Sequence, residues 1–174
     1  NRLRLISHTF INRLLLRGAI SYSADLFLDV ISKNKDIDFF IDVGAADGEL
    51  TDLFLRKFGN EKAMYLIEPR RNKCEKLKQK YSFHRDFGVY QTLITEDARS
   101  VSFAVKGNGS SIYDVEENDR IVVEKTTRLD SLLADKPIHD ALLKIDVQGA
   151  EMEVLKSLGD LKEHVRAIIV ECNN

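Results

Sequence analysis

The sequence has few cysteines, little net charge and no long apolar run, and each of these absences excludes a class of protein. Its two cysteines, Cys74 and Cys172, lie far apart and form no metal-type pair, so we expect reduced thiols in a cytoplasmic protein and no metal site. A formal net charge of −2 gives no reason to expect nucleic acid or an anionic membrane as a partner. No stretch of about 18 apolar residues is present, so no membrane span is predicted.

What is present is the composition of an ordinary globular domain. Hydrophobic residues make up 44% of the 174 positions and charged residues 31%, which is enough for one domain with a real core. The N-terminus has no signal-peptide pattern, and because the first residue is Asn we interpret the chain as a trimmed fragment.

Hydrophobic spacing predicts a helical segment, residues 1–36, followed by an α/β core, residues 37–174. Helix is predicted over residues 2–32, and short apolar runs then alternate with helical patterns. This alternation predicts a Rossmann-like three-layer α/β sandwich with a mostly parallel sheet. Strands are predicted at residues 39–43, 63–67, 89–94, 101–105, 121–123, 141–145 and 165–170. Helices are predicted at residues 49–58, 70–81 and 150–159, the second of them an exposed basic helix.

In such a sheet, ligands bind at the carboxyl ends of the strands, near the point where the strand order reverses. The rule selects the polar residues that follow the predicted strands. It places the turn at residues 42–48 together with Glu68, Thr92, Asp146 and Glu171.

The turn after the first core strand reads DVGAADG, residues 42–48, and carries unusual charge. Its glycines permit a sharp turn and a close approach to the main chain, but their spacing does not fit the G-x-G-x-x-G pattern of dinucleotide-binding proteins. Asp42, Asp47 and Glu49 would repel a pyrophosphate, at a cost of a few kcal/mol for each close contact. A cationic ligand without phosphate, such as S-adenosylmethionine, suits the turn better.

Glu68 ends the second core strand, about 20 residues after the turn, where a carboxylate can accept both hydroxyls of a ribose. NAD also has ribose hydroxyls, so Glu68 alone does not separate the two cofactors. An NAD-linked oxidoreductase or epimerase would need G-x-G-x-x-G and a pair such as Tyr-x-x-x-Lys, and neither occurs in the sequence.

Several segments together resemble the FkbM family of S-adenosylmethionine-dependent methyltransferases. They are FIDVGAADG at residues 40–48, GNGSS at 107–111, TTRLDSLL at 126–133, LLKIDVQGAEMEVLKSL at 142–158 and IIVEC at 168–172. The resemblance runs from about residue 38 to 171. It implies a Rossmann-like methyltransferase that acts on a hydroxyl of a sugar, a glycan or a small natural product.

The resemblance also implies roles for individual residues. The turn would line the methionine end of the cofactor, Glu68 the ribose, and Thr92 with Leu93 the adenine, while Asp146 would face the transfer site. The residues expected to bind the cofactor are Asp42, Gly44, Ala45, Ala46, Asp47, Gly48, Glu68, Pro69, Thr92 and Leu93.

Transfer to a hydroxyl needs a proton acceptor within reach of it. Asp146 ends the fourth core strand and is the first candidate, and Glu171, at the end of the adjacent strand, is the second. Lys144 is a charge within an apolar run, where it could pair with a carboxylate and orient it. The alternative is a structural ion pair among Lys144, Glu151 and Glu171.

The sequence departs from the family pattern in two ways. Gln148 stands where the family block D-V-E-G-A-E has its first glutamate. The sequence also stops just past the fifth core strand, where the family's sheet normally adds a sixth and a seventh, so that either the fragment is cut or the protein ends early. The fifth strand would then be an edge in need of cover, and this edge or the N-terminal helix could pair with a second copy. Both departures favour a second reading, a non-catalytic binding or assembly domain.

Overall fold

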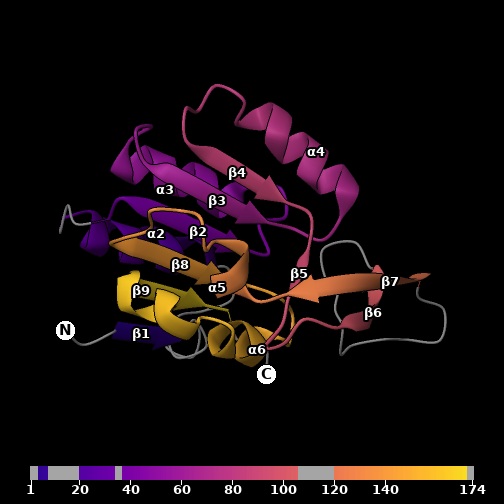
Figure 1. The fold of residues 1–174 in the computed structure, drawn as a ribbon. Coiled ribbons are helices and arrows are strands. Elements are labelled where there is room, and N and C mark those ends of the chain that lie inside the picture. Colours follow the sequence, from indigo (N-terminus) through magenta and orange to yellow (C-terminus); the bar gives the residue numbers. More distant parts are fainter. Residues whose placement is uncertain (1–3, 8–19, 34–36, 106–119, 172–174) are drawn as a thin grey trace.

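The computed structural model describes residues 4–7, 20–33, 37–105 and 120–171. Its elements follow one another as strands that alternate with helices, as expected for an α/β core (Figure 1). In chain order they are β1 (Arg4–Ser7), α2 (Ile20–Ser32), β2 (Phe39–Val43), α3 (Glu49–Phe58), β3 (Ala63–Ile67), α4 (Arg71–Lys80), β4 (Phe87–Tyr90), β5 (Leu93–Ile94), β6 (Ser100–Val105), β7 (Arg120–Thr127), α5 (Leu129–Leu132), β8 (Ala141–Ile145), α6 (Glu151–Lys156), the 3₁₀ helix η1 (Gly159–His164) and β9 (Val165–Val170).

The main sheet has six strands in the order β1-β9-β8-β2-β3-β4, and every neighbouring pair is parallel. From β2 the chain builds outward to β3 and β4, and later returns to the other side of β2 with β8 and β9. The strand order therefore reverses between β2 and β8, which is where this type of sheet leaves a crevice at its carboxyl edge. The predicted Rossmann-like fold is confirmed.

Alternation along the strands sends apolar side chains to both faces of the sheet. Phe39 and Ile41 of β2 belong to a buried cluster with side chains of α5 and α6, whereas Phe40 belongs to a second cluster with side chains of α2, α3 and α4. Strands β2, β3 and β8 are buried along their whole length because helices cover both faces. This is the three-layer sandwich that continuous apolar runs predict.

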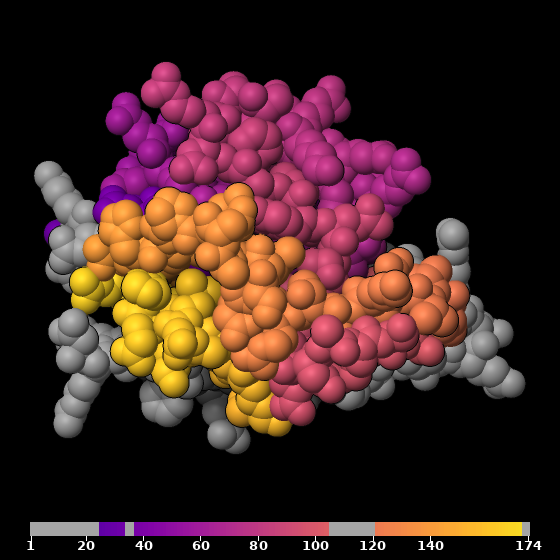
Figure 2. Space-filling view, in the orientation of Figure 1, coloured from indigo at the N-terminus to yellow at the C-terminus, as the bar shows by residue number. Residues whose placement is uncertain are grey.

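A small second sheet stands beside the carboxyl edge of the main sheet, in the order β5-β7-β6 (Figure 1). β6 and β7, which include the two strands predicted at 101–105 and 121–123, form an antiparallel pair and extend from one end of the body (Figure 2). The single strand predicted over residues 89–94 is wrong, because the chain leaves the main sheet after Tyr90. β4 pairs with β3, and β5 pairs with β7.

The predicted helix over residues 2–32 is correct for Ile20–Ser32 and wrong for Arg4–Ser7, which form β1. β1 pairs in parallel with β9, from Arg4 opposite Ala167 to Ser7 opposite Val170. An unpaired strand edge presents a row of unsatisfied backbone groups, and β1 satisfies those of β9. None of the described helices combines the length and the apolar character that crossing a membrane requires.

Candidate functional site

A pocket of about 640 Å³, part of it open to solvent, lies at the carboxyl ends of β2, β3 and β8. The main sheet forms its floor, and residues of β5 and β6 form another wall, so segments that are far apart in the sequence meet there. Seven residues expected from the sequence line it: Gly44, Ala46, Glu68, Pro69, Thr92, Leu93 and Asp146. Eight more, not singled out as cofactor-binding or catalytic residues, also line it: Val43, Ile67, Arg70, Ile94, Phe103, Val147, Gln148 and Ala150.

The other expected site residues lie outside the pocket wall. Asp42 is buried under the β2–α3 turn, and Ala45 packs into the core on the α3 side of the sheet. Asp47 points to α4, where it forms an ion pair with Lys73. Gly48 caps the N-terminus of α3.

The charge of the turn is neutralised by neighbouring cations. Lys144 pairs with Asp42, and Lys73 pairs with Asp47 and holds the pKa of that carboxyl below its usual value. Two of the three carboxylates that were expected to repel a pyrophosphate, Asp42 and Asp47, are therefore paired with cations.

The backbone amides of the turn distinguish it instead. The amides of Gly44 and Ala45 donate to the Ile67 carbonyl, at 2.9 and 3.1 Å, and the Gly48 amide donates to the Ala45 carbonyl at 2.7 Å. The Ala46 amide donates to Glu68 Oε2 at 2.9 Å. Phosphate-binding loops direct such amides at the ligand. Here the amides of Gly44, Ala45, Ala46 and Gly48 are directed at protein acceptors, so these four do not point into the pocket.

Glu68 is 1% exposed, and each of its oxygens accepts two hydrogen bonds. Oε1 accepts from the Arg70 amide at 3.0 Å and from Arg70 Nε at 2.6 Å, and Oε2 accepts from the Ala46 amide and from Arg70 Nη2 at 3.2 Å. The prediction that Arg70 belongs to an exposed basic face is wrong. Its guanidinium folds back over Glu68, because a buried carboxylate needs a nearby cation.

The rest of the pocket wall is largely apolar. Pro69 follows Glu68, Leu93 and Ile94 come from β5, and Phe103 comes from β6. Phe103 was not predicted as a site residue, because its apolar strand pattern does not tell which part of the sheet β6 approaches. Together these side chains make a surface suited to a flat apolar group such as a nucleobase.

Asp146 follows β8 and has a donor or a cation at each oxygen. Gln148 Nε2 donates to Asp146 Oδ1 at 2.9 Å, and Lys144 Nζ lies 3.6 Å from Asp146 Oδ2. The Asp146 amide donates to the Val43 carbonyl at 3.0 Å, which fixes the main chain against β2. Gln148 reaches back from a left-handed backbone conformation, with φ at 53°.

Lys144 is buried and contacts groups from two strands. It lies directly opposite Asp42 in the β2–β8 pair, 3.0 Å from Asp42 Oδ1, and donates to the Gly44 carbonyl at 2.5 Å. Lys144 Nζ is close enough to Asp42 Oδ1 to form an ion pair, but it is not aligned for a hydrogen bond to that oxygen. Burial acts to lower the pKa of Lys144, but attraction to Asp42 and Asp146 outweighs it and the pKa is raised.

The sequence left open a structural ion pair among Lys144, Glu151 and Glu171. In the structure, these residues have other partners. Lys144 pairs with Asp42 and Asp146, while Glu151 accepts the Gly149 amide at 3.0 Å. Glu171 follows β9, and its backbone amide donates to the Ile145 carbonyl at 2.9 Å. Burial, and next the Asp146 carboxylate, raise the pKa of Glu171.

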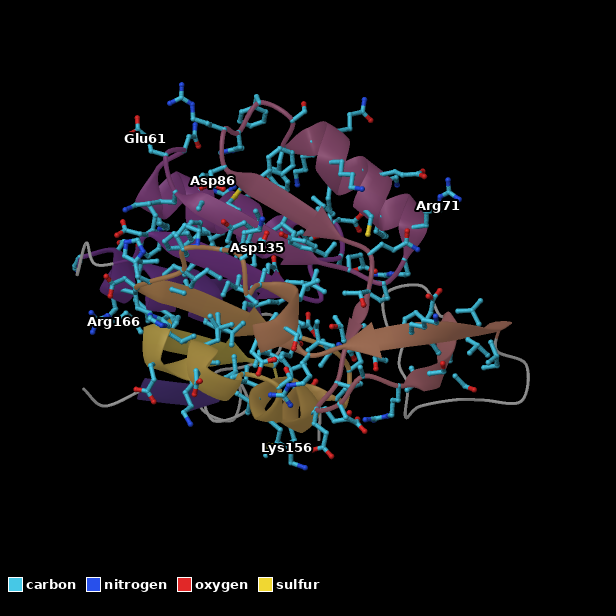
Figure 3. All side chains as sticks on the ribbon, viewed as in Figure 1. Glu61, Arg71, Asp86, Asp135, Lys156 and Arg166 are labelled. Carbon is cyan, nitrogen blue, oxygen red and sulfur yellow. The ribbon has the colours of Figure 1, made fainter. Side chains whose placement is uncertain are left out.

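A second polar group lies at the amino end of the sheet, away from the pocket. Possible ligand atoms of Asp38, His139 and Asp140 lie within 4.8 Å of one another. Lys62 pairs with Asp38 at 2.7 Å and Arg166 pairs with Asp140, so both carboxylates are already compensated. Arg166, like Glu61, Arg71 and Lys156, lies at the periphery of the molecule (Figure 3).

The fold and the pocket together define a class: a Rossmann-like domain with a pocket at the switch point of its sheet. A sequence model of the methyltransferase FkbM domain matches residues 42–174, so the chain belongs to the FkbM methyltransferase family. A search of curated proteins gave no match.

Among solved structures, the methyltransferase FkbM from Methylobacillus flagellatus KT is similar, with a TM-score of 0.52 and 20% sequence identity. The match covers 74% of this chain and 31% of that chain, so the present chain spans under a third of that protein's length. At this identity the likeness establishes the shared fold.

Proposed function

We propose that this domain binds S-adenosylmethionine in the pocket and transfers its methyl group to a hydroxyl of a sugar, a glycan or a small natural product. The observation that carries the proposal is the set of groups around the pocket. Glu68 follows β3 and Asp146 follows β8, the two strands that flank β2. At the usual spacing of neighbouring strands, β3 and β8 are about 10 Å apart. Apolar side chains of the pocket wall lie between the loops that follow them. Four amides of the turn are engaged within the protein, which supports a nucleoside without phosphates as the ligand.

The residues present fit this cofactor at three points. Leu93, Ile94 and Phe103 offer an apolar surface to the base, Glu68 can accept ribose hydroxyls, and Asp146 supplies a negative charge near the cationic end. When bound, S-adenosylmethionine supplies a methyl group on a sulfonium that leaves as a neutral thioether.

Asp146 is the proposed proton acceptor. As the acceptor oxygen forms its bond to the methyl carbon, the hydroxyl proton moves to the Asp146 carboxylate, so charge does not build up on the product oxygen. Gln148 and Lys144 keep that carboxylate in place. Positioning of this kind can account for roughly 7–11 kcal/mol of a displacement barrier.

Ribose binding at Glu68 must be coupled to a movement of Arg70. Both Glu68 oxygens already accept two hydrogen bonds each, and the Arg70 side chain contributes one to each oxygen. A ribose can reach Glu68 by replacing the guanidinium while the two backbone amides stay in place.

Calorimetry with S-adenosylhomocysteine tests the proposal. We expect the wild-type domain to bind it, and Glu68→Gln to weaken binding by about 1–3 kcal/mol, roughly 5- to 150-fold, through loss of charged hydrogen bonds. Arg70→Ala should bind at least as tightly as wild type, because the ribose then has no competitor. Glu75→Gln, on the exposed face of α4, is the matched control.

Two results would contradict the proposal. Binding of NADH in place of S-adenosylhomocysteine would assign the pocket to a dinucleotide. Binding of S-adenosylhomocysteine, without transfer of labelled methyl groups to any of a panel of glycans and hydroxylated small molecules, would favour the non-catalytic domain.

A further inference from the structure

Part of the pocket wall belongs to the small sheet β5-β7-β6 and not to the main sheet. Leu93 and Ile94 of β5 and Phe103 of β6 line the pocket. β5 pairs with β7 over only two residue pairs, which is short for a strand, so backbone pairing alone holds this wall weakly. The loop at residues 95–99, which joins β5 to β6, therefore has a strong influence on where the wall lies.

We propose that an ion pair between Arg99 of this loop and Glu153 of α6 is a clamp that fixes the small-sheet wall relative to the loop carrying Asp146. Arg99 and Glu153 are then positioning residues for the bound cofactor. Neither residue lines the pocket, so each acts through the elements that it holds. The inference rests on the proposed function for the identity of the ligand. The clamp itself concerns this chain alone and can be tested without a ligand.

Glu153 is a buried carboxylate whose hydrogen-bond donors, among the described residues, come from the 95–99 loop. It is 8% exposed, and Arg99 Nη2 lies 2.7 Å from its Oε1 and 2.6 Å from its Oε2. The Glu96 amide also donates to Glu153 Oε2, at 3.4 Å. Arg99 forms a further pair with Asp97 inside the loop, which helps to orient its guanidinium. Because a buried carboxylate needs a paired cation, the clamp holds α6 and the loop in one relative position.

The other side of the clamp is the start of α6. Val147, Gln148 and Ala150, in the segment between β8 and α6, also line the pocket. The Glu153 amide donates to the Ala150 carbonyl at 3.0 Å, so Glu153 lies in the first turn of the helix that follows this segment. The clamp thus connects two parts of the pocket wall that are far apart in the sequence. A ligand that contacts both parts binds tightly only when their relative position is correct.

The loop moves together with the small sheet because buried hydroxyl groups join it to β7. Thr95 and Thr126 are both buried, and their Oγ1 atoms lie 2.6 Å apart. The Arg99 amide donates to Thr126 Oγ1 at 3.0 Å, and the Thr126 amide donates to the Arg99 carbonyl at 2.8 Å. A displacement of Arg99 therefore displaces β7 and the two strands that pair with it.

Calorimetry with S-adenosylhomocysteine on the full chain tests the clamp, at a temperature where urea curves show every variant to be folded. Glu153→Gln keeps the shape of the side chain but removes its charge, and we expect roughly 3- to 30-fold weaker binding. Arg99→Gln should give a similar loss, and the double variant should lose no more than either single variant, since both remove one interaction. Arg99→Lys keeps the cation and should recover part of the affinity.

Lys156→Met is the matched control. Lys156 pairs with Glu96 at 2.7 Å, so it joins the same helix to the same loop, but both side chains are exposed to solvent. Exposed pairs contribute little, and we expect less than about a twofold change in affinity. A role in stability alone would not weaken binding by a folded variant. Equal affinities of Glu153→Gln, Arg99→Gln and the wild type would therefore overturn the inference.

Methyl NMR spectra of the full chain without ligand provide the second measurement. Glu153→Gln should shift or broaden the methyl signals of Leu93 and Ile94, whereas Ile41 in the core of the main sheet should keep its signal. Lys156→Met should leave all three signals in place. Unmoved Leu93 and Ile94 signals in Glu153→Gln would overturn the clamp. If the wild type binds no S-adenosylhomocysteine, the proposed function fails, and these spectra alone decide whether the clamp holds the small sheet.

Discussion

At the scale of single residues, Lys144 is the charge on which the centre of the sheet depends. It lies within the fully buried strand β8 and serves Asp42, Asp146 and the carbonyl of Gly44. Thr51 from α3 donates to the other Asp42 oxygen at 2.8 Å. A buried charge is tolerated only when it is paired and hydrogen-bonded, and Asp42 meets that condition through Lys144.

We therefore expect Lys144→Met to lower the free energy of unfolding by about 3–5 kcal/mol, because it leaves Asp42 buried without its cation. Urea denaturation followed by circular dichroism measures the loss. Lys62→Met breaks the more exposed pair with Asp38 and should cost no more than about 1 kcal/mol. Equal losses in the two variants would show that the Asp42 pair contributes nothing special.

The sequence predicted that Lys144 pairs with a carboxylate, and its pairs with Asp42 and Asp146 confirm this. The alternative of a structural ion pair, however, named Glu151 and Glu171 as the partners and did not name Asp42. Glu151 and Glu171 are close to it in the sequence or on the adjacent predicted strand. Asp42 is 102 positions earlier and becomes its neighbour only through the register of β2 against β8. A single sequence specifies strands better than it specifies which residues of two strands lie opposite each other.

At the scale of elements, the β2–α3 turn is the most tightly constrained connection near the pocket. Gly44 has a φ of 82°, and a Cβ there would lie 1.8 Å from the Asp146 carbonyl oxygen. The turn and the β8–α6 connection are therefore in backbone contact. A side chain at residue 44 would push apart the two loops that carry the proposed cofactor and base residues.

Gly44→Ala should cost more than about 4 kcal/mol or prevent folding, because it combines a positive φ with a clash against backbone. Gly59→Ala separates the two causes. Gly59 has a similar φ of 89° but no atom within 4 Å of an added Cβ, so only the conformational cost of roughly 1–3 kcal/mol applies. Thermal unfolding of both variants measures the two losses of stability. Similar losses would show that the clash at residue 44 does not contribute.

The elements were predictable where the period of the pattern was clear. Four strands of the main sheet, β2, β3, β8 and β9, and helices α3 and α4 lie where the apolar spacing predicts them. β1 was missed because four residues inside a helix-like pattern carry no strand signal of their own, and pairing with β9 decides their conformation. The break between β4 and β5 was missed because it results from two different partner strands.

At the scale of the whole molecule, β1 closes one side of the main sheet. Deletion of residues 1–7 should leave the β9 edge unpaired, and we expect lower stability and self-association through that edge. Light scattering after size exclusion reports the mass, and the urea midpoint reports the stability. Deletion of residues 1–3 leaves β1 intact and is the control. A monomer of unchanged stability after the longer deletion would show that β1 does not contribute to the sheet.

The candidate site was predictable to the extent that it follows from chain topology. Residues at the carboxyl ends of parallel strands lie at the same edge of the sheet, independently of the conformation of the loops that follow. The sequence therefore predicted that Gly44, Glu68 and Asp146 lie together, and all three line the pocket. Phe103 and Arg70 were missed because they depend on how β6 docks and how one long side chain folds back. The paired state of Asp47 was missed because α4 supplies the cation from across the turn.

The inward-facing amides of the β2–α3 turn affect how this pocket can evolve. A loop that reads its ligand through main-chain groups keeps that ability through almost any substitution, and its preference is hard to alter. In the proposed function, discrimination falls to side chains that line the pocket without holding the turn, such as Leu93 and Phe103. We therefore expect that single codon changes at these positions alter what the pocket accepts and leave the β2–α3 turn intact.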